Sequence, residues 1–142
     1  MSIQERYLQY VEAFEETYID DDWSRLEEYF TADSMYDNGD GSVGMGREAV
    51  LEKLKNAVDG LDRKMTQRIV SFAPPTSEGN TVTSHWTAEY TMDGAPNLKF
   101  TGVEFAVYEG DRIAHLRDEM DDAAVAAITN WLAQHGALLQ DG

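Results

Sequence analysis

The chain has 142 residues, the usual size of one domain, and 42% of them are apolar, which is enough for a single core. Its 27 acidic residues outnumber the 11 basic ones, and the formal net charge of -16 disfavours nucleic acid and anionic membranes as partners. The absence of cysteine excludes disulfides, thiolate metal sites and a cysteine nucleophile.

The N-terminal part of the chain is predicted to be helical. Apolar residues recur every three or four positions over 3–18, and charges run through the same segment, so it is an amphipathic helix rather than a signal peptide. A second helix is expected over 23–30, a short strand over 34–38 and a third helix over 46–60. No apolar run approaches the roughly 20 residues that a membrane span needs, so we expect a soluble, cytoplasmic protein.

The second half of the chain reads as an antiparallel meander. Strands are expected over 67–73, 81–92, 99–108 and 112–120, with turn residues between them and a closing helix over about 125–138. The order predicts an α+β fold with one domain over 1–142. In it, a curved antiparallel or mixed sheet packs on the three N-terminal helices and leaves a cone with an open mouth.

A glycine stretch after the short strand fits a nucleotide-binding pattern only by its letters. "GDGSVG" at 39–44 matches G-x-G-x-x-G, but the preceding strand is polar and follows two helices. The later strands are joined by hairpins, so no βαβ unit surrounds the glycines. We interpret the stretch as a loop at the mouth of the cone.

Several motifs resemble those of one known family. "YVEAF", "DWSRLEEYFTADSMYDN", "GREAVLEKL" and "GDRIAHLRDEMD" are similar to the NTF2-like superfamily, in its SnoaL-like, polyketide cyclase and limonene epoxide hydrolase branches, from about residue 7 to 122. The resemblance implies a conical fold with an apolar pocket and a homodimer. It also implies a small hydrophobic ligand, which many members of the family process by moving protons.

The resemblance also offers site residues. Asp118 in "LRD" matches the family's acid on the last strand, and Tyr36 and Asn38 in "MYDN" match the pair that holds water in the epoxide hydrolases. Asp37 matches the general base of ketosteroid isomerase, and Tyr10 lies near that enzyme's oxyanion tyrosine.

The sequence departs from these relatives on the long strand. The hydrolases carry an Arg and an Asp two residues apart, where this chain has His85 and Thr87. Glu104 lies in roughly the right strand for the isomerase's second acid, without a matching motif. Strict epoxide hydrolysis is therefore not indicated.

Elementary chemistry favours Asp118 as the main catalytic candidate. A carboxyl in an apolar pocket has a raised pKa, which suits it to acid/base work near neutral pH, and we expect His85 to be its partner. Asp37 is the third catalytic candidate, although aspartate at such a position is more often a turn former. The residues expected to contact substrate are Tyr36, Asn38, Tyr10, Thr87, Phe14, Leu116 and Met120.

These features predict a cofactor-free acid/base enzyme of the isomerase, cyclase or hydratase/hydrolase type. Its substrate would be a hydrophobic, oxygenated small molecule. No metal site is expected, because His85, His115 and His135 lack ligand spacing. The alternatives are a non-catalytic ligand-binding module and a structural dimer.

Overall fold

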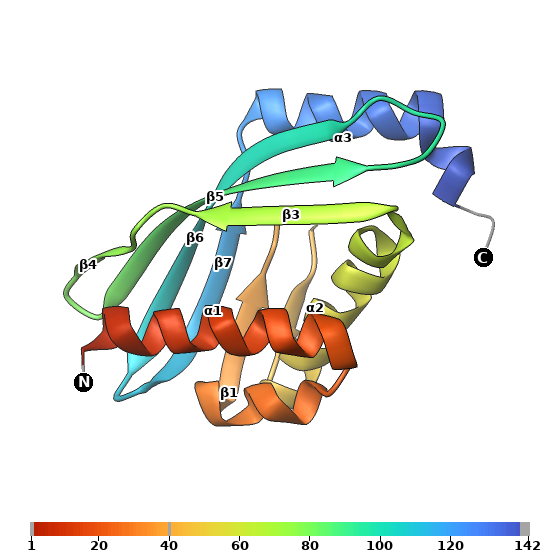
Figure 1. The fold of residues 1–142 in the computed structure, drawn as a ribbon. Helices are drawn as coiled ribbons and strands as arrows, with labels where there is room; N and C mark the ends of the chain where they lie inside the picture. Colours follow the sequence, from red (N-terminus) through yellow and green to blue (C-terminus); the bar gives the residue numbers. More distant parts are fainter. Residues whose placement is uncertain (1, 40, 140–142) are drawn as a thin grey trace.

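In the computed structural model, which describes residues 2–39 and 41–139, helices pack against the concave face of a curved sheet (Figure 1). Helix α1 (Ile3–Asp20) begins with a capping box in which Ser2 and Glu5 each bond the other's backbone, and it ends where Asp21 adopts a left-handed conformation. The segment η1 (Trp23–Tyr29), expected as a second helix, is a 3₁₀ helix. Helix α2 (Arg47–Gly60) is followed by the short 3₁₀ segment η2 (Asp62–Lys64).

The sheet is mixed. Its strands are β1 (Phe30–Asp37), β2 (Val43–Met45), β3 (Gln67–Phe72), β4 (Thr76–Glu78), β5 (Thr81–Thr91), β6 (Leu98–Glu109) and β7 (Arg112–Glu119). They lie in the order β2-β1-β7-β6-β5-β3, and β4 pairs with β5. β1 runs parallel to β7, whereas the other neighbouring strands are antiparallel. The meander of long strands is therefore as predicted, while β2 and β4 were not expected.

The glycine stretch is part of this sheet. After Gly39 and Gly41, both at positive φ, the chain returns as β2 and pairs antiparallel with β1. A dinucleotide fold requires a parallel crossover at this point, so the geometry agrees with the rejection of a nucleotide motif. Residue 40, within the stretch, lies outside the described residues.

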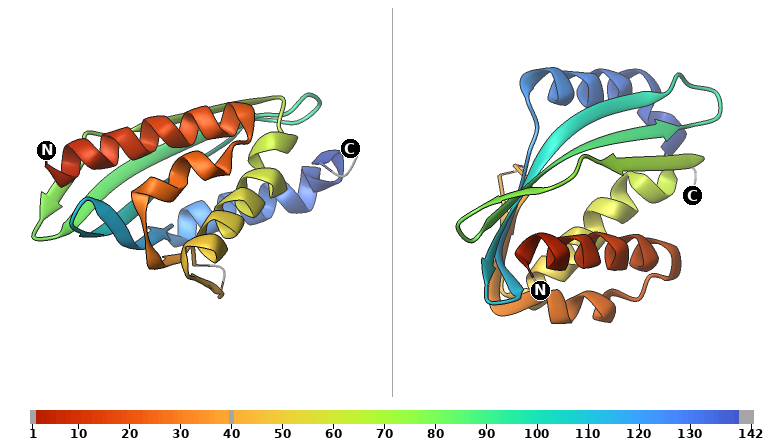
Figure 2. Two further views of the ribbon diagram at one scale, coloured as in Figure 1. Left: turned by 90° about the horizontal axis from the view of Figure 1, so that it is seen from below. Right: turned by 60° about the vertical axis from the view of Figure 1, so that its left-hand side comes forward.

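The inner face of the cone forms the main core. Aromatic side chains of α1 pack edge-on in this core: the Tyr10 ring lies 5.5 Å from that of Phe30 and 6.2 Å from that of Phe14. Figure 2 shows that α1 and α2 lie on the same side of the sheet. Their apolar faces, together with the sheet's inner residues, enclose the site described below.

The last helix covers an edge that the strands leave open. β7 pairs with β6 only from Val103 onwards, and α3 (Asp122–His135) lies along the earlier part of β6 (Figure 1). The Trp131 indole fixes the helix there by donating a 2.8 Å hydrogen bond to the carbonyl of Pro96. None of the helices in the described part of the chain is long and apolar enough to span a membrane.

Candidate active site

A cavity of about 190 Å³ lies between the helices and the concave face of the sheet. Most of its wall is apolar or aromatic, and the polar exceptions form two groups, one on β6 and β7 and the other on α1, η2 and β3. The lining residues are Tyr10, Val11, Phe14, Glu15, Tyr36, Leu54, Ala57, Val58, Asp62, Arg68, Val70, Phe72, Trp86, Ala88, Tyr90, Phe100, Glu104 and Asp118.

Two carboxyl groups face each other across the central strands. Glu104 of β6 and Asp118 of β7 are register partners, so their side chains stand side by side on the same face. Tyr36 of β1 donates a hydrogen bond to Asp118 Oδ2 (2.9 Å), and Tyr7 of α1 donates one to Glu104 Oε1 (2.6 Å). Each carboxyl therefore has its own tyrosine donor.

Burial makes it costly to ionise both carboxyls. Burial raises the pKa of Glu104 well above its usual value, and the neighbouring Asp118 charge raises it further. Burial also raises the pKa of Asp118, while hydrogen bonds from Glu104, Tyr36 and Trp86 oppose that rise. Asp118 Oδ1 is buried without a hydrogen-bond partner among the described residues. Because the Asp118 charge raises the Glu104 pKa further, while neighbouring donors oppose the rise of the Asp118 pKa, Glu104 is the member of the pair that more readily keeps a proton.

A glycine in the middle of β6 makes room for the Trp86 indole. Gly102 is the register partner of Trp86, and a Cβ at this position would lie 2.2 Å from the indole ring. The indole therefore lies close over the β6 backbone, and it lines the same cavity wall as Asp118. Glycine inside a strand is unfavourable unless something approaches the backbone closely, as Trp86 does here.

The second polar group surrounds Arg68 on β3. Its Nε donates to Asp62 Oδ2 (2.7 Å), and its two terminal nitrogens donate to the two oxygens of Glu15 on α1 (2.8 and 3.1 Å). Burial raises the pKa of Asp62, and the Arg68 guanidinium opposes that rise. The Tyr18 ring covers the guanidinium at 4.3 Å. These contacts connect α1, η2 and β3 at one end of the cavity.

The structure brings some of the predicted site residues together. Asp118, Tyr36, Tyr10 and Phe14 all line the cavity. Tyr10 is fully enclosed there, and burial raises its pKa far above the usual value. Leu116, predicted to contact substrate, lies completely buried in the core and outside the cavity wall.

The predicted pair of Asp118 and His85 is not formed. His85 aligns across the strands with Val103 and Glu119, one position away from the row of Glu104 and Asp118, so it stands on the outer face of the sheet. Thr87 and Met120 line the same outer groove as His85. For these three residues the prediction of a place in the cavity was wrong. His85 and Thr87 stand on the other face of β5, and β7 ends at Glu119, so strand alternation does not extend to Met120.

The segment after Tyr36 also turns away from the cavity. Asp37 accepts a 2.8 Å hydrogen bond from the Gly39 N–H and so forms a local turn, as the structural alternative for this residue suggested. Asn38 lines a shallow groove with residues of β2 and α2. The described residues of the glycine stretch likewise contribute nothing to the cavity wall, so that loop is not its mouth.

Sequence reasoning missed the partners of Asp118. Tyr7 lies on the apolar stripe of α1 and Trp86 lies within the strand β5, so the sequence pattern around each of them indicates packing and not a polar role. A buried acid within the apolar strand β6 was the available signal for Glu104. No group of three or more potential metal ligands occurs in residues 2–39 and 41–139.

The family follows from comparison with known proteins. The model of the SnoaL-like domain family matches residues 8–116 of this chain. The chain belongs to the SnoaL-like domain family. No curated protein matches this SnoaL-like chain.

Solved structures agree on the NTF2-like cone fold, as predicted. TerC co-crystallised with polyporic acid is 14% identical, with a TM-score of 0.68 and coverage of 93% of this chain and 99% of that one. A SnoaL-like polyketide cyclase, named as such provisionally, from Shewanella putrefaciens is 12% identical, with a TM-score of 0.69 and coverage of 95% and 88%. An LEH-like epoxide hydrolase of M. tuberculosis is 18% identical, with a TM-score of 0.63 and coverage of 94% and 96%.

Proposed function

We propose that this SnoaL-like protein is an acid/base enzyme that acts on a small hydrophobic, oxygenated molecule and uses only its own side chains for the chemistry. Asp118 is the proton-transferring group, and Glu104 is its acid partner. The observation that carries the proposal is the pair of adjacent carboxyls in an apolar cavity, whose environments separate their pKa values.

The pair divides the chemical work between its two members. The Asp118 carboxylate accepts a proton from a carbon beside a carbonyl, or from a water or hydroxyl that attacks the ligand. Neutral Glu104 donates a hydrogen bond or its proton to the ligand oxygen where negative charge develops. Tyr36 and Tyr7 hold the two carboxyls in place through their hydrogen bonds.

Cavity size and the related structures support this substrate class. A cavity of about 150 Å³ in another protein holds one benzene molecule, so 190 Å³ suits a ligand with about one ring. One similar structure was obtained with polyporic acid, and others are named as a polyketide cyclase and an epoxide hydrolase. These names favour isomerisation, cyclisation or hydration of a cyclic ligand.

Replacement of Asp118 tests the proposal. A panel of small cyclic ketones, enols and epoxides is screened for turnover, and kcat/KM is measured for the best substrate. Asp118→Asn is expected to lower kcat/KM by about 10²–10⁴-fold, the usual contribution of a positioned acid/base. The matched control is Glu119→Gln, the next residue on β7, whose side chain faces outwards. Unchanged turnover by Asp118→Asn contradicts the proposal.

A non-catalytic ligand-binding module is the second candidate. The long strand β5 contributes only Trp86, Ala88 and Tyr90 to the cavity wall, and none of these supplies a carboxyl or histidine. A ligand that binds in the cavity and is recovered unaltered after long incubation, with wild type and Asp118→Asn alike, favours this candidate over the enzyme.

A further inference from the structure

Arg68 is the one positively charged side chain that lines the cavity in the described residues 2–39 and 41–139. Only 7% of its side chain is exposed, so its charge has been withdrawn almost completely from water. Such a buried cation needs anionic partners, and a cation at a cavity wall is also available to a ligand.

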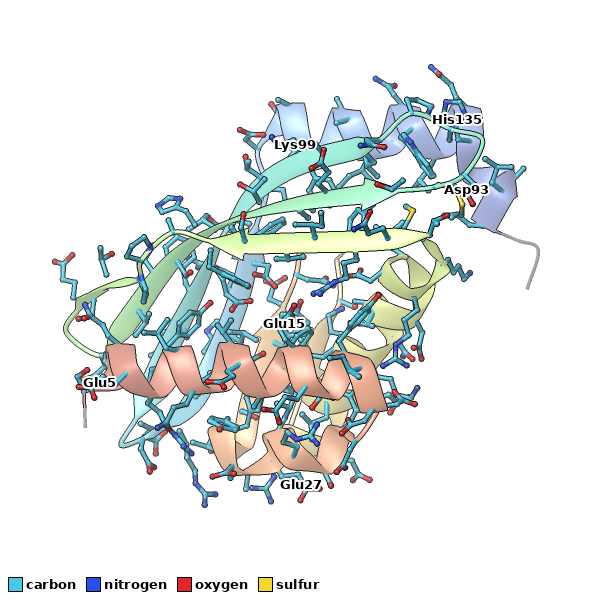
Figure 3. The ribbon with its side chains drawn as sticks, viewed as in Figure 1. Glu5, Glu15, Glu27, Asp93, Lys99 and His135 are labelled. Carbon is cyan, nitrogen blue, oxygen red and sulfur yellow. The ribbon has the colours of Figure 1, made fainter. Side chains whose placement is uncertain are left out.

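The two anionic partners of Arg68 differ in burial. Asp62, which bonds Nε, has a side chain that is 16% exposed and is part of the permanent wall. Glu15, which accepts hydrogen bonds from both terminal nitrogens, has a side chain that is 39% exposed, and it lines the cavity. Figure 3 shows Glu15 on the side of α1 that faces β3. The replaceable partner is therefore Glu15.

We infer that Arg68 binds a carboxylate of the ligand, and that in the free protein the Glu15 carboxylate occupies this position. The inference rests on the proposed function and names its ligand class: a one-ring hydrophobic molecule that bears a carboxylate. A planar carboxylate accepts two parallel bonds from a guanidinium, as Glu15 does with distances of 2.8 and 3.1 Å. Exchange leaves the buried guanidinium paired, because one carboxylate replaces another, and Glu15, whose side chain is 39% exposed, can return to water.

The charges of the cavity give such a ligand a single orientation. Glu104 and Asp118 form a negatively charged pair, which repels a ligand carboxylate from that wall. Arg68 attracts it to another wall, formed by β3 and α1. The apolar and reactive part of the ligand is thereby left beside Asp118, and binding energy from a non-reacting group positions the reacting one.

Calorimetric titration with phenylacetate and its neutral analogue phenylacetamide tests this inference. We expect Arg68→Gln to weaken phenylacetate binding about tenfold or more, because it removes a charge-assisted pair, and to change phenylacetamide binding less than about twofold. Glu15→Gln is expected to tighten phenylacetate binding about twofold to fivefold by removing the internal competitor. Arg63→Gln is the matched control, since Arg63 also pairs with aspartates and lies over Tyr18 but does not line the cavity.

Glu15→Gln decides the matter even where Arg68→Gln fails to fold, because Glu15 is partly exposed on α1. Unchanged or weaker phenylacetate binding by Glu15→Gln overturns the inference. A Glu15→Gln variant that does not bind phenylacetate at millimolar concentration overturns it as well. If phenylacetamide and phenylacetate bind equally well in every variant, Arg68 does not bind the ligand carboxylate, but the proposed role of Asp118 is unaffected. Loss of turnover in Asp118→Asn is measured separately, so the two proposals can fail independently.

Discussion

The cavity contains two clusters, each with two carboxyl groups, and they are neutralised in different ways. Glu15 and Asp62 have the Arg68 guanidinium between them, whereas among the described residues no cation pairs with Glu104 or Asp118, whose donors are the neutral Tyr7 and Tyr36. Burial disfavours charge in both places. The first cluster offsets it with a fixed positive charge, and the second with a proton.

This difference suits the two clusters to the two proposed roles, ligand binding and proton transfer. A guanidinium stays charged at any accessible pH, so the Arg68 cluster presents a constant charge to a ligand. A shared proton can move, so the Glu104–Asp118 pair can accept or donate one during a reaction. The residue type is the same in both clusters, and the counter-charge decides what the carboxyls can do.

The largest expected effect comes from removal of the fixed positive charge. Arg68→Met leaves the largely buried Asp62 carboxyl without its cation, which should lower the free energy of unfolding by about 3–5 kcal/mol in urea titrations. Arg25→Met, which breaks a more exposed pair with Asp20, should cost much less. Equal losses in the two variants would show that the Arg68 cluster behaves like a surface ion pair.

The two tyrosines test which carboxyl carries the negative charge. A hydrogen bond to a charged group contributes about 1.5–3 kcal/mol and one to a neutral group about 0.5–1.5 kcal/mol. Tyr36→Phe should therefore destabilise the protein more than Tyr7→Phe does. The distances alone suggest the reverse order, since the Tyr7 bond is the shorter one. A larger loss from Tyr7→Phe would place the charge on Glu104.

Stability against pH tests the shared proton. An acid whose pKa is raised by folding makes the folded state bind more protons, so stability falls as pH rises above the unfolded pKa of about 4.3 and levels off above the folded pKa. Glu104→Gln removes this loss. It should raise the free energy of unfolding at pH 8 by more than about 1 kcal/mol, because one unit of pKa corresponds to about 1.4 kcal/mol.

Urea titrations at pH 4.5 and 8 measure this change. Glu119→Gln, on the outer face of the sheet, is the control for the loss of a carboxylate outside the cavity. Any dependence of stability on pH that remains in Glu104→Gln belongs to other carboxyls whose pKa is raised by folding, and Asp62 is one of these. A wild-type protein that gains stability between these pH values, with Glu104→Gln following the same curve, would rule out the buried proton.

The sequence predicts most of the fold, for identifiable physical reasons. Long alternating strands and a periodic first helix give strong local signals, whereas β2 and β4 have three residues each and form by pairing with a neighbour. The parallel contact of β1 with β7 joins segments about 80 residues apart, which no local pattern reports. The homodimer that the family resemblance implies stays a prediction, which sedimentation analysis would test.

The site was harder to predict than the fold because it depends on cross-strand register. Alternation shows which residues of one strand share a face, but it does not show which residues of the next strand stand beside them. Asp118 could thus be expected inside the cone, but Glu104 could not be identified as its cross-strand neighbour, and His85 was assigned to the wrong face of β5.

The smallest expected effect is at His85. His85→Ala removes an exposed side chain on the outer face of β5, so the free energy of unfolding should change by less than about 0.5 kcal/mol. Turnover should stay within about twofold of wild type, since His85 stands on the opposite face of the sheet from Glu104 and Asp118. Ser84 and Trp86, its neighbours along the strand, point inwards, so the substitution leaves the cavity wall intact. A His85→Ala variant with turnover as low as that of Asp118→Asn would mean that the reaction takes place on the outer groove of the sheet.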